Sequence, residues 1–289
     1  MPEKRADPQY SAALDLIADQ TKLHGLPGWR CEAKRTSQKR CDPIPDDHEM
    51  MRRICVAIAF SQGAQSKLIE KLIVKPVFSE AFANFDVNRL AQKNPETIRR
   101  HFWKSLGHMR FKGKVDAMVR GATVMRDLAK EYGSFAEYLK SFQIPQRLKS
   151  GGDVDQFWKG FLCLRADLRS RKMPFFQNTT SLLQLLLDLD HDAVKPDLII
   201  MRLARRIGMV EKETGEANLQ EVVRKVQEYS ISREVRASLV DLQMLAFGGQ
   251  SSASQLLSER FCPASDPCEN RDCVIGRKGL CNAYANLYV

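Results

Sequence analysis

The stretch from Met173 to Gly208 reads MPFFQNTTSLLQLLLDLDHDAVKPDLIIMRLARRIG, and its apolar pattern decides the class of fold. Leucines cover more than one face of the segment from Thr179 to Leu187, which has the length of a helix. After a charged break, Pro196 and Asp197 are typical of a helix start, and Gly208 of a helix end. The stretch therefore predicts two consecutive helices that follow a short polar connector.

Asp197 is placed by this pattern at the N-terminus of the second helix. There the helix dipole and the free backbone amides favour an ionised carboxylate. Taken by itself, an aspartate in this position is most often a helix cap.

The rest of the chain shows the same helical period, and no run alternates like a strand between hairpin turns. The fold class expected is all-α. The stretch from Gly25 to Asp47 is polar and basic, and it is interpreted as a connector. The other segments predicted to be helical include Pro8 to Leu23, Met50 to Phe60, Phe111 to Ala129, Ser134 to Phe142, Val154 to Leu168 and Arg233 to Phe247.

The charge balance favours a polyanionic partner. The chain has 289 residues, with 45 Lys and Arg against 35 Asp and Glu, a net charge of +10 and a pI near 9.2. Its N-terminus is charged and carries no apolar signal core, and no apolar run approaches the roughly 20 residues that a spanning helix needs. We expect an intracellular, cytoplasmic monomer that does not bind a membrane.

Four of the eight cysteines lie close together near the end of the sequence. Clustered cysteines in an intracellular chain indicate a metal site rather than disulfides. Four thiolates within twenty residues would hold either a [4Fe-4S] cluster or a zinc ion, and four unligated thiols are the alternative. The spacing is Cys262-x5-Cys268-x4-Cys273-x7-Cys281.

The stretch from Met173 onward resembles the helix-hairpin-helix and catalytic-aspartate region of the endonuclease III superfamily of DNA glycosylases. Met173-Pro174 falls on the Leu-Pro of the hairpin, and Asp197 falls on the catalytic aspartate. Thr179 falls where bifunctional members carry their Schiff-base lysine, which implies a monofunctional enzyme. The resemblance implies DNA contacts from Lys172, Pro174, Gln177, Asn178 and Thr179.

Two further segments add to the resemblance. Ala59 to Ser66 resembles the helix junction at the mouth of the superfamily's base pocket, and Met109 to Ala117 resembles a basic stretch of the 3-methyladenine glycosylase branch. Ordinary polar residues at a helix junction and a solvated basic face are the respective alternatives. The implied pocket or wedge residues are Ser61, Gln62 and Gln65, and the implied phosphate contacts are Arg110, Lys112 and Lys114.

The resemblance also implies two helical domains beside a cleft for DNA and the flipped base. One would span residues 46–189 and include the hairpin, and the other would combine residues 1–45 with 190–289. The cysteine loop, residues 262–281, resembles the iron–sulfur loop of the endonuclease III group, although that group has the spacing x6, x2 and x5. Its place after the last helix favours [4Fe-4S] over zinc.

The hairpin departs from the superfamily pattern, since Phe175 and Gln177 replace its glycines. Either the connector makes fewer close amide contacts with DNA, or side chains of Asn178, Thr179 and Thr180 substitute for them. The hypothesis that follows is a monofunctional glycosylase that removes an alkylated or otherwise modified base from double-stranded DNA. A non-catalytic DNA-binding relative is the alternative. An iron–sulfur electron carrier would explain neither the hairpin nor the charge.

Overall fold

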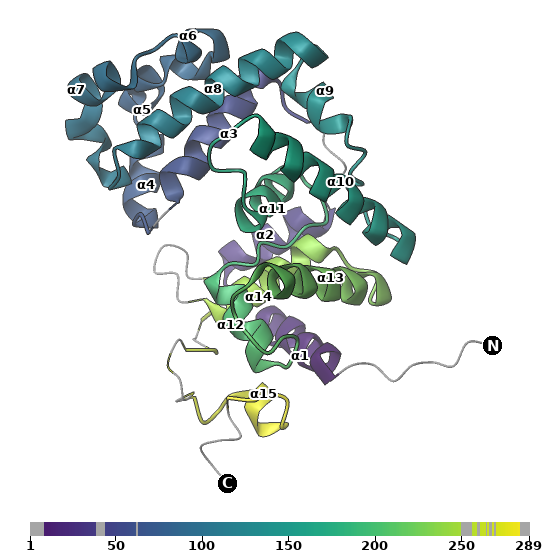
Figure 1. Cartoon of the computed structure of the whole chain (residues 1–289). Coiled ribbons are helices and arrows are strands. Elements are labelled where there is room, and N and C mark those ends of the chain that lie inside the picture. The colour runs from purple at the N-terminus through teal and green to yellow at the C-terminus, as the bar shows by residue number, and fades with distance from the viewer. Residues whose placement is uncertain are drawn as a thin grey trace. The chain divides into compact units, whose positions relative to one another are not determined.

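The computed structural model describes residues 9–38, 44–61, 63–249, 256–258, 261–263, 265, 268 and 270–283. Within these ranges the chain is helical and forms no strand, apart from one isolated bridge between Gly25 and Leu257, which confirms the expected all-α fold (Figure 1). None of the helices in the described ranges is both long enough and apolar enough to cross a membrane.

The helical elements are short to medium in length, and the connections between them range from tight turns to longer loops (Figure 1). They are α1 (Gln9–Leu23), α2 (Pro27–Gln38), α3 (Asp47–Phe60), α4 (Ser66–Ile73), α5 (Pro76–Ala81), η1 (Ala83–Phe85), α6 (Val87–Ala91), α7 (Pro95–Leu106), η2 (Gly107–Met109), α8 (Gly113–Tyr132), α9 (Phe135–Lys140), α10 (Gly151–Ser170), α11 (Thr179–Asp188), α12 (Leu198–Arg206), α13 (Glu216–Ser232), α14 (Ala237–Gly248) and α15 (Val274–Arg277).

The chain divides into two compact units. Unit 1 combines Met1–Asp42, Pro145–Asp155 and Leu186–Val289, and unit 2 combines Pro43–Ile144 and Gln156–Leu185. Each unit therefore contains segments that are distant in the sequence.

Unit 2 is built around α8, which packs against α3, α6, α7 and α9. Val115, Met118, Ala122 and Met125 recur at helical spacing along α8 and are completely buried. The connector after α10 packs on the same helix, because a Cβ added at Gly121 would lie 3.7 Å from Pro174 Cγ. The core of unit 2 thus supports the hairpin directly.

Unit 1 is built around α14, which packs against α1, α2, α12 and α13. Its buried stripe contains Val240, Met244 and Phe247. Helix α12 approaches α14 closely, since a Cβ added at Gly248 would lie 3.1 Å from Ile199. The helix that follows Asp197 is therefore held by the core of unit 1.

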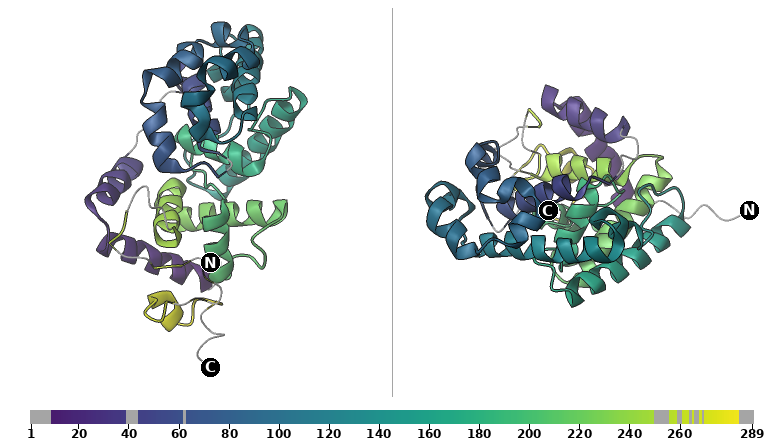
Figure 2. Two further views of the ribbon diagram at one scale, coloured as in Figure 1. Left: turned by 90° about the vertical axis from the view of Figure 1, so that its left-hand side faces the viewer. Right: turned by 90° about the horizontal axis from the view of Figure 1, so that it is seen from above.

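The predicted connector from Gly25 to Asp47 is wrong in part, because residues Pro27–Gln38 form helix α2 (Figure 2). Pro27 occupies the first helical position, where its missing N–H has no intrahelical partner to lose. Trp29 is buried and anchors a helix whose other faces are polar. With a single large apolar residue, the segment lacks the repeated apolar positions from which a helix is predicted. The stretch also contains two cysteines: Cys31 is exposed on α2, and Cys41 lies outside the described residues.

Candidate active site, hairpin and cysteine loop

Asp197 caps helix α12, as the sequence predicts. Its Oδ1 accepts the backbone N–H of Ile199 at 3.0 Å and that of Ile200 at 3.2 Å. The other carboxylate oxygen, Oδ2, lies 3.8 Å from Lys195 Nζ, and the side chain is 26% exposed. One oxygen therefore satisfies the helix end, while the carboxylate keeps a second oxygen near the protein surface.

The turn before α12 is fixed by a residue that sequence patterns did not single out. Asp241 of α14 is buried, and its Oδ1 accepts the backbone N–H of Lys195 at 2.8 Å. Asp197 N–H donates in turn to the carbonyl of Lys195 at 2.7 Å. One available signal was that Asp241 is a charged residue within the otherwise apolar stripe of α14.

In the connector between α10 and α11, a residue other than glycine has a positive φ angle. Phe175, which replaces the first hairpin glycine, has a φ of 72°. This left-handed conformation is uncommon for a side chain of this size and is energetically unfavourable. At this position the connector therefore has a backbone conformation that glycine adopts without strain.

Side chains hold the carbonyls of the connector. Ser181 Oγ donates to the Phe175 carbonyl at 2.5 Å, and Gln177 Nε2 donates to the Met173 carbonyl at 2.7 Å. Arg169 Nε donates to the Gln177 carbonyl at 2.8 Å. These bonds orient the peptide units of the connector, and the backbone N–H of Phe176 donates to the Pro174 carbonyl at 2.9 Å.

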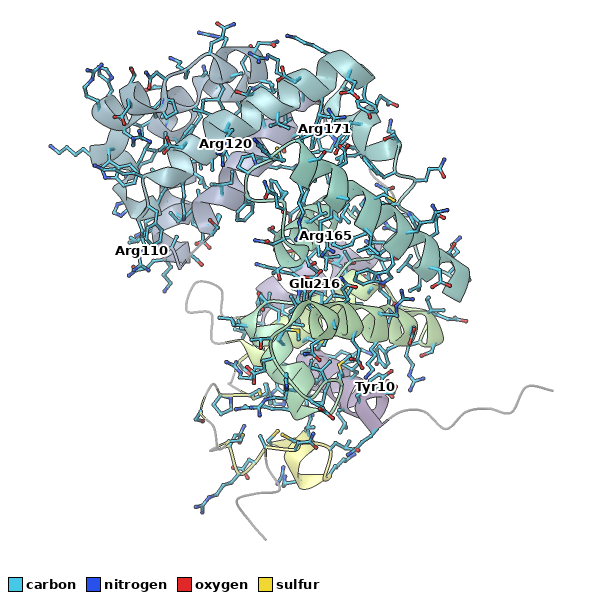
Figure 3. The ribbon with its side chains drawn as sticks, viewed as in Figure 1. Tyr10, Arg110, Arg120, Arg165, Arg171 and Glu216 are labelled. Carbon is cyan, nitrogen blue, oxygen red and sulfur yellow. The ribbon has the colours of Figure 1, made fainter. Side chains whose placement is uncertain are left out.

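Thr179 begins α11 and is buried, and its hydroxyl accepts a hydrogen bond of 2.5 Å from the guanidinium of Arg165 on α10. Arg165 is labelled in Figure 3. The threonine therefore joins the two helices that flank the hairpin instead of presenting a polar group to solvent. Lys172 and Asn178 are exposed on the connector, whereas Pro174 is buried. Among the predicted hairpin contacts, Lys172 and Asn178 are the most accessible.

The junction after α3 and the basic stretch before α8 meet in the structure. Lys114 Nζ donates to the carbonyls of Ala59 at 2.9 Å and Ser61 at 2.6 Å. The guanidinium of Arg110 donates to the carbonyl of Gly63 at 2.6 Å. Two segments that carry the family resemblance are thus brought together although about 50 positions separate them.

The predicted pocket residues occupy different positions at this junction. Ser61 ends α3 and its hydroxyl donates to the Ile58 carbonyl, whereas Gln65 is exposed just before α4. Gln62 lies outside the described residues. The structure thus places Ser61 and Gln65 on one turn.

The three cations predicted to contact phosphate do not share one environment. Arg110 and Lys112 are exposed, but Lys114 is only 3% exposed. Burial, followed by the repulsion of Arg110, lowers the pKa of Lys114 to about 8. In this structure the Lys114 ammonium stabilises the C-terminal carbonyls of α3, a role that a basic sequence pattern does not reveal.

The four cysteines of the tail are buried, free thiols, and one of them, Cys262, contacts Arg206 of α12. The guanidinium of Arg206 is 1% exposed and donates to Cys262 Sγ at 3.1 Å and to the Pro263 carbonyl at 2.8 Å. Burial raises the pKa of Cys262 and of Cys273, and Arg206 partly opposes this effect at Cys262. As the described residues are placed, no three His, Cys, Asp or Glu side chains form a group that could hold a metal ion.

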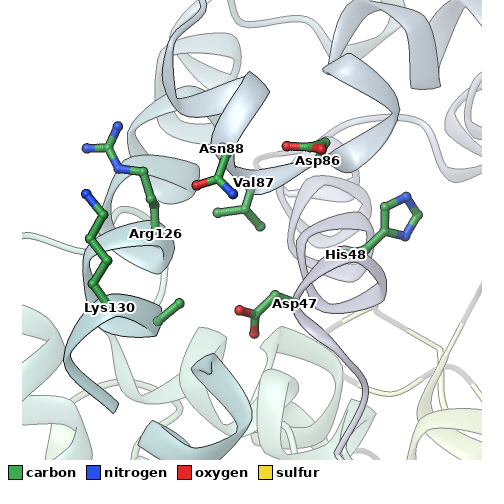
Figure 4. A pocket seen from close by; sticks show the side chains of 8 residues that line it. Asp47, His48, Asp86, Val87, Asn88, Arg126 and Lys130 are labelled. Atoms are coloured by element: carbon green, nitrogen blue, oxygen red, sulfur yellow. The ribbon is translucent and has the colours of Figure 1, made fainter. Parts of the chain in front are cut away.

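A separate pocket lies within unit 2, between the start of α3, the start of α6 and one face of α8 (Figure 4). Asp47, His48 and Asp86 contribute to one side, and Arg126 and Lys130 contribute to the other. Asp47 also accepts the backbone N–H of Phe135 and so holds the start of α9. The pocket contains none of the predicted site residues.

The fold and these sites together define a class of protein. Two helices joined by a tight, strained connector, followed by a helix with an aspartate cap, are the features expected of a helix-hairpin-helix DNA glycosylase. The sequence profile of the methyladenine glycosylase family matches residues 38–179, a range that holds the α3 junction, the basic stretch and the hairpin. The match covers just under half of the chain, and it supports a DNA glycosylase of the helix-hairpin-helix superfamily, a class of protein whose substrate is DNA.

Asp197 and the four cysteines lie beyond the matched range. Neither the curated proteins nor the solved structures contain a match to the chain.

Proposed function

We propose that the protein is a monofunctional DNA glycosylase that flips a modified base out of the duplex and hydrolyses its N-glycosidic bond. Asp197 supports this proposal most directly. Its carboxylate accepts hydrogen bonds from two backbone amides at the start of α12, and it keeps a second oxygen near the surface.

The chemistry requires a negative charge beside the sugar. When the base leaves, positive charge develops on the sugar, and a carboxylate that is already oriented stabilises this oxocarbenium-like state. Asp197 Oδ1 is used by the helix cap, so Oδ2 would face C1′ and help to orient the attacking water. A cap that fixes the carboxylate before substrate binds reduces the reorganisation needed during the reaction.

The absence of an amine at position 179 supports hydrolysis without strand cleavage. A lyase step at this position would need a nucleophilic amine for the Schiff base, and a threonine hydroxyl cannot form one. The Thr179 hydroxyl is also buried and bound to Arg165. The expected product is therefore an intact strand that carries an abasic site.

DNA contacts would come from the connector and from the basic stretch of unit 2. Lys172 and Asn178 are exposed on the connector, and Arg110 and Lys112 are exposed before α8. Phosphate contacts of this kind position a duplex without reading its sequence. The modified base would be read after it leaves the stack, and residues at the α3 junction, including Ser61 and Gln65, are the proposed pocket or wedge.

We also propose that the four cysteines hold a [4Fe-4S] cluster, with zinc as the alternative. All four thiols are buried, and burial raises the pKa of Cys262. The cationic Arg206 beside Cys262 opposes this rise in pKa, and it would help to stabilise a thiolate ligand there. Zinc would require the sulfurs to converge to about 3.8 Å from one another, given tetrahedral Zn–S bonds of about 2.3 Å. A bound cluster would supply folding energy to this loop, and Cys262, Cys268, Cys273 and Cys281 would be its ligands.

Base release measured by mass spectrometry tests the catalytic proposal. Purified protein would be incubated with duplexes that contain alkylated, oxidised, deaminated or naturally hypermodified bases. We expect release of one class of base, an abasic site without strand cleavage, and loss of release in Asp197→Asn with DNA affinity retained. Asp155→Asn is a matched control, because Asp155 is an exposed carboxylate paired with Arg224.

A non-catalytic DNA-binding relative is the second candidate, and the replacement of both hairpin glycines favours it. Duplex binding without release of any base in the panel would support this candidate and contradict the glycosylase proposal. Metal analysis tests the cysteine proposal separately. Iron with visible charge-transfer absorption should be lost in Cys268→Ser but retained in Cys163→Ser, since Cys163 is exposed and distant in sequence from the loop.

A further inference from the structure

Asp241 is a buried carboxyl group in an unfavourable environment. Its side chain lies on the buried stripe of α14 and is 6% exposed as a residue. Its hydrogen-bond partner among the described residues is the backbone N–H of Lys195, at 2.8 Å, and no described residue forms an ion pair with it. A buried carboxylate with a single amide partner destabilises the folded state.

The charged groups around Asp241 increase this cost. Asp197 and Asp188 repel its ionised form, and Lys195 attracts it more weakly than burial opposes it. Burial is the largest effect, and together these influences raise the pKa of Asp241 to about 7. A residue kept only for packing would be better replaced by an uncharged side chain, so a carboxyl at this position indicates a function.

The position of Asp241 connects it to the candidate catalytic residue. Its carboxyl oxygen holds Lys195, whose carbonyl accepts the N–H of Asp197 and whose ammonium lies 3.8 Å from Asp197 Oδ2. The turn from Lys195 to Asp197 is therefore held from the core of unit 1 by Asp241. A shift of this turn would move the Asp197 carboxylate and the ammonium beside it.

We propose that Asp241 is a positioning residue for Asp197, which fixes the turn before α12 and adds its own negative charge to the field at the reacting sugar. The inference rests on the proposed function of Asp197. When Asp241 ionises, two carboxylates instead of one stabilise the developing cation, and base release becomes faster.

Single-turnover base release as a function of pH tests the proposal. In wild-type protein we expect the rate to rise roughly three- to tenfold between about pH 6 and about pH 8, as Asp241 ionises. Asp241→Asn keeps an oxygen for the Lys195 amide but cannot ionise, so its rate should stay near the low-pH value. Asp241→Leu cannot accept that hydrogen bond, and its rate should fall at every pH. Asp155→Asn should keep the wild-type profile.

Thermal unfolding supplies a second readout that needs no DNA. Because the pKa of Asp241 is raised from 3.8 to about 7, its neutral form stabilises the fold at low pH, and that contribution is lost as the pH rises through this interval. Asp241→Asn should therefore have a higher Tm than wild type at about pH 8, and the difference should shrink toward about pH 4. A purely structural role predicts a lower Tm at both values.

The outcomes separate this inference from the proposed function. Parallel pH–rate profiles for wild type and Asp241→Asn, with Asp197→Asn inactive, would overturn the role of Asp241 alone. Base release that persists in Asp197→Asn would overturn the proposed function, and with it this inference. A lower Tm for Asp241→Asn at about pH 8 would also overturn the inference, because it would make the carboxyl a stabilising element.

Discussion

Replacing Arg206 by alanine should destabilise unit 1 much more than replacing its neighbour Arg205. Arg206 is completely enclosed, and its guanidinium donates to Cys262 Sγ, to the Pro263 carbonyl and, at 2.5 Å, to the Ser265 carbonyl. The backbone of Arg206 also accepts the N–H of Asn282 at 2.7 Å. One residue of α12 thus holds several points of the cysteine loop.

The size of the effect follows from these contacts. Loss of the side chain leaves two carbonyls and a sulfur without their donor, at about 1–3 kcal/mol for each buried acceptor. It also removes about three buried methylene groups, worth about 0.8 kcal/mol each. The substitution also removes a buried charge, and it removes Arg206 Nε, which has no hydrogen-bond partner among the described atoms. Removing this desolvation cost offsets a few kcal/mol of the loss. We expect a net loss of about 3 kcal/mol in the free energy of unfolding.

Trp29 provides a local signal for the measurement. It is the single tryptophan of unit 1, since the other two of the chain, Trp103 and Trp158, lie in unit 2. In a Trp103→Phe/Trp158→Phe background, urea unfolding followed by tryptophan fluorescence would report unit 1. Arg205→Ala is the matched control.

Arg205 pairs with Glu213 at 2.7 Å, but both side chains are about one-third exposed, at 36% and 31%. Such pairs contribute about 0–1 kcal/mol. Equal effects of Arg205→Ala and Arg206→Ala, both below about 1 kcal/mol, would refute the assigned role of Arg206.

Three further changes test the hairpin and the basic stretch. Phe175→Gly should change the free energy of unfolding by less than about 1 kcal/mol, because relief of the positive φ offsets the lost contact with the ring of Phe176. Phe176→Ala, at the buried neighbour, should lower the free energy of unfolding by about 3–5 kcal/mol. The pKa of Lys114 is lowered from 10.5 to about 8, so the folded state loses this proton at a lower pH than the unfolded state does. The free energy of unfolding should therefore rise between about pH 8 and about pH 10.5, and urea titrations at several pH values should show no such rise for Lys114→Met. Replacing Arg110 and Lys112 by alanine should reduce the salt dependence of duplex binding by about two phosphate contacts in fluorescence anisotropy, and an unchanged slope would exclude both residues from the DNA interface.

The sequence predicted the elements around Asp197 well because their signals are local. The start of α11 at Thr179, the cap at Asp197 and the end of α12 before Gly208 agree with the structure. Capping depends on the side chain and on amides two or three positions away, and Gly208 has a φ of 77° that favours glycine. These properties do not require knowledge of the tertiary fold.

The features that sequence patterns missed depend on distant partners. Asp241 contacts Lys195 from 46 positions away, and Lys114 contacts Ala59 from 55 positions away. Neither separation leaves a period or a motif in the chain. Trp29 similarly anchors α2 by burial against other segments rather than by a repeating apolar face.

Lys114 shows why a basic stretch is an ambiguous signal for DNA binding. An ammonium group is attracted both to phosphate oxygens and to the carbonyl oxygens at a helix C-terminus. A lysine in the sequence is therefore compatible with either role. Burial separates the two roles, because a lysine enclosed by the fold cannot reach a duplex, while its exposed neighbours Arg110 and Lys112 can. Lys114 holds the junction that contains Ser61 by donating to the Ser61 carbonyl. The exposed cations Arg110 and Lys112 belong to the same stretch of sequence. One segment therefore both shapes the proposed base pocket and supplies charge to the proposed DNA surface.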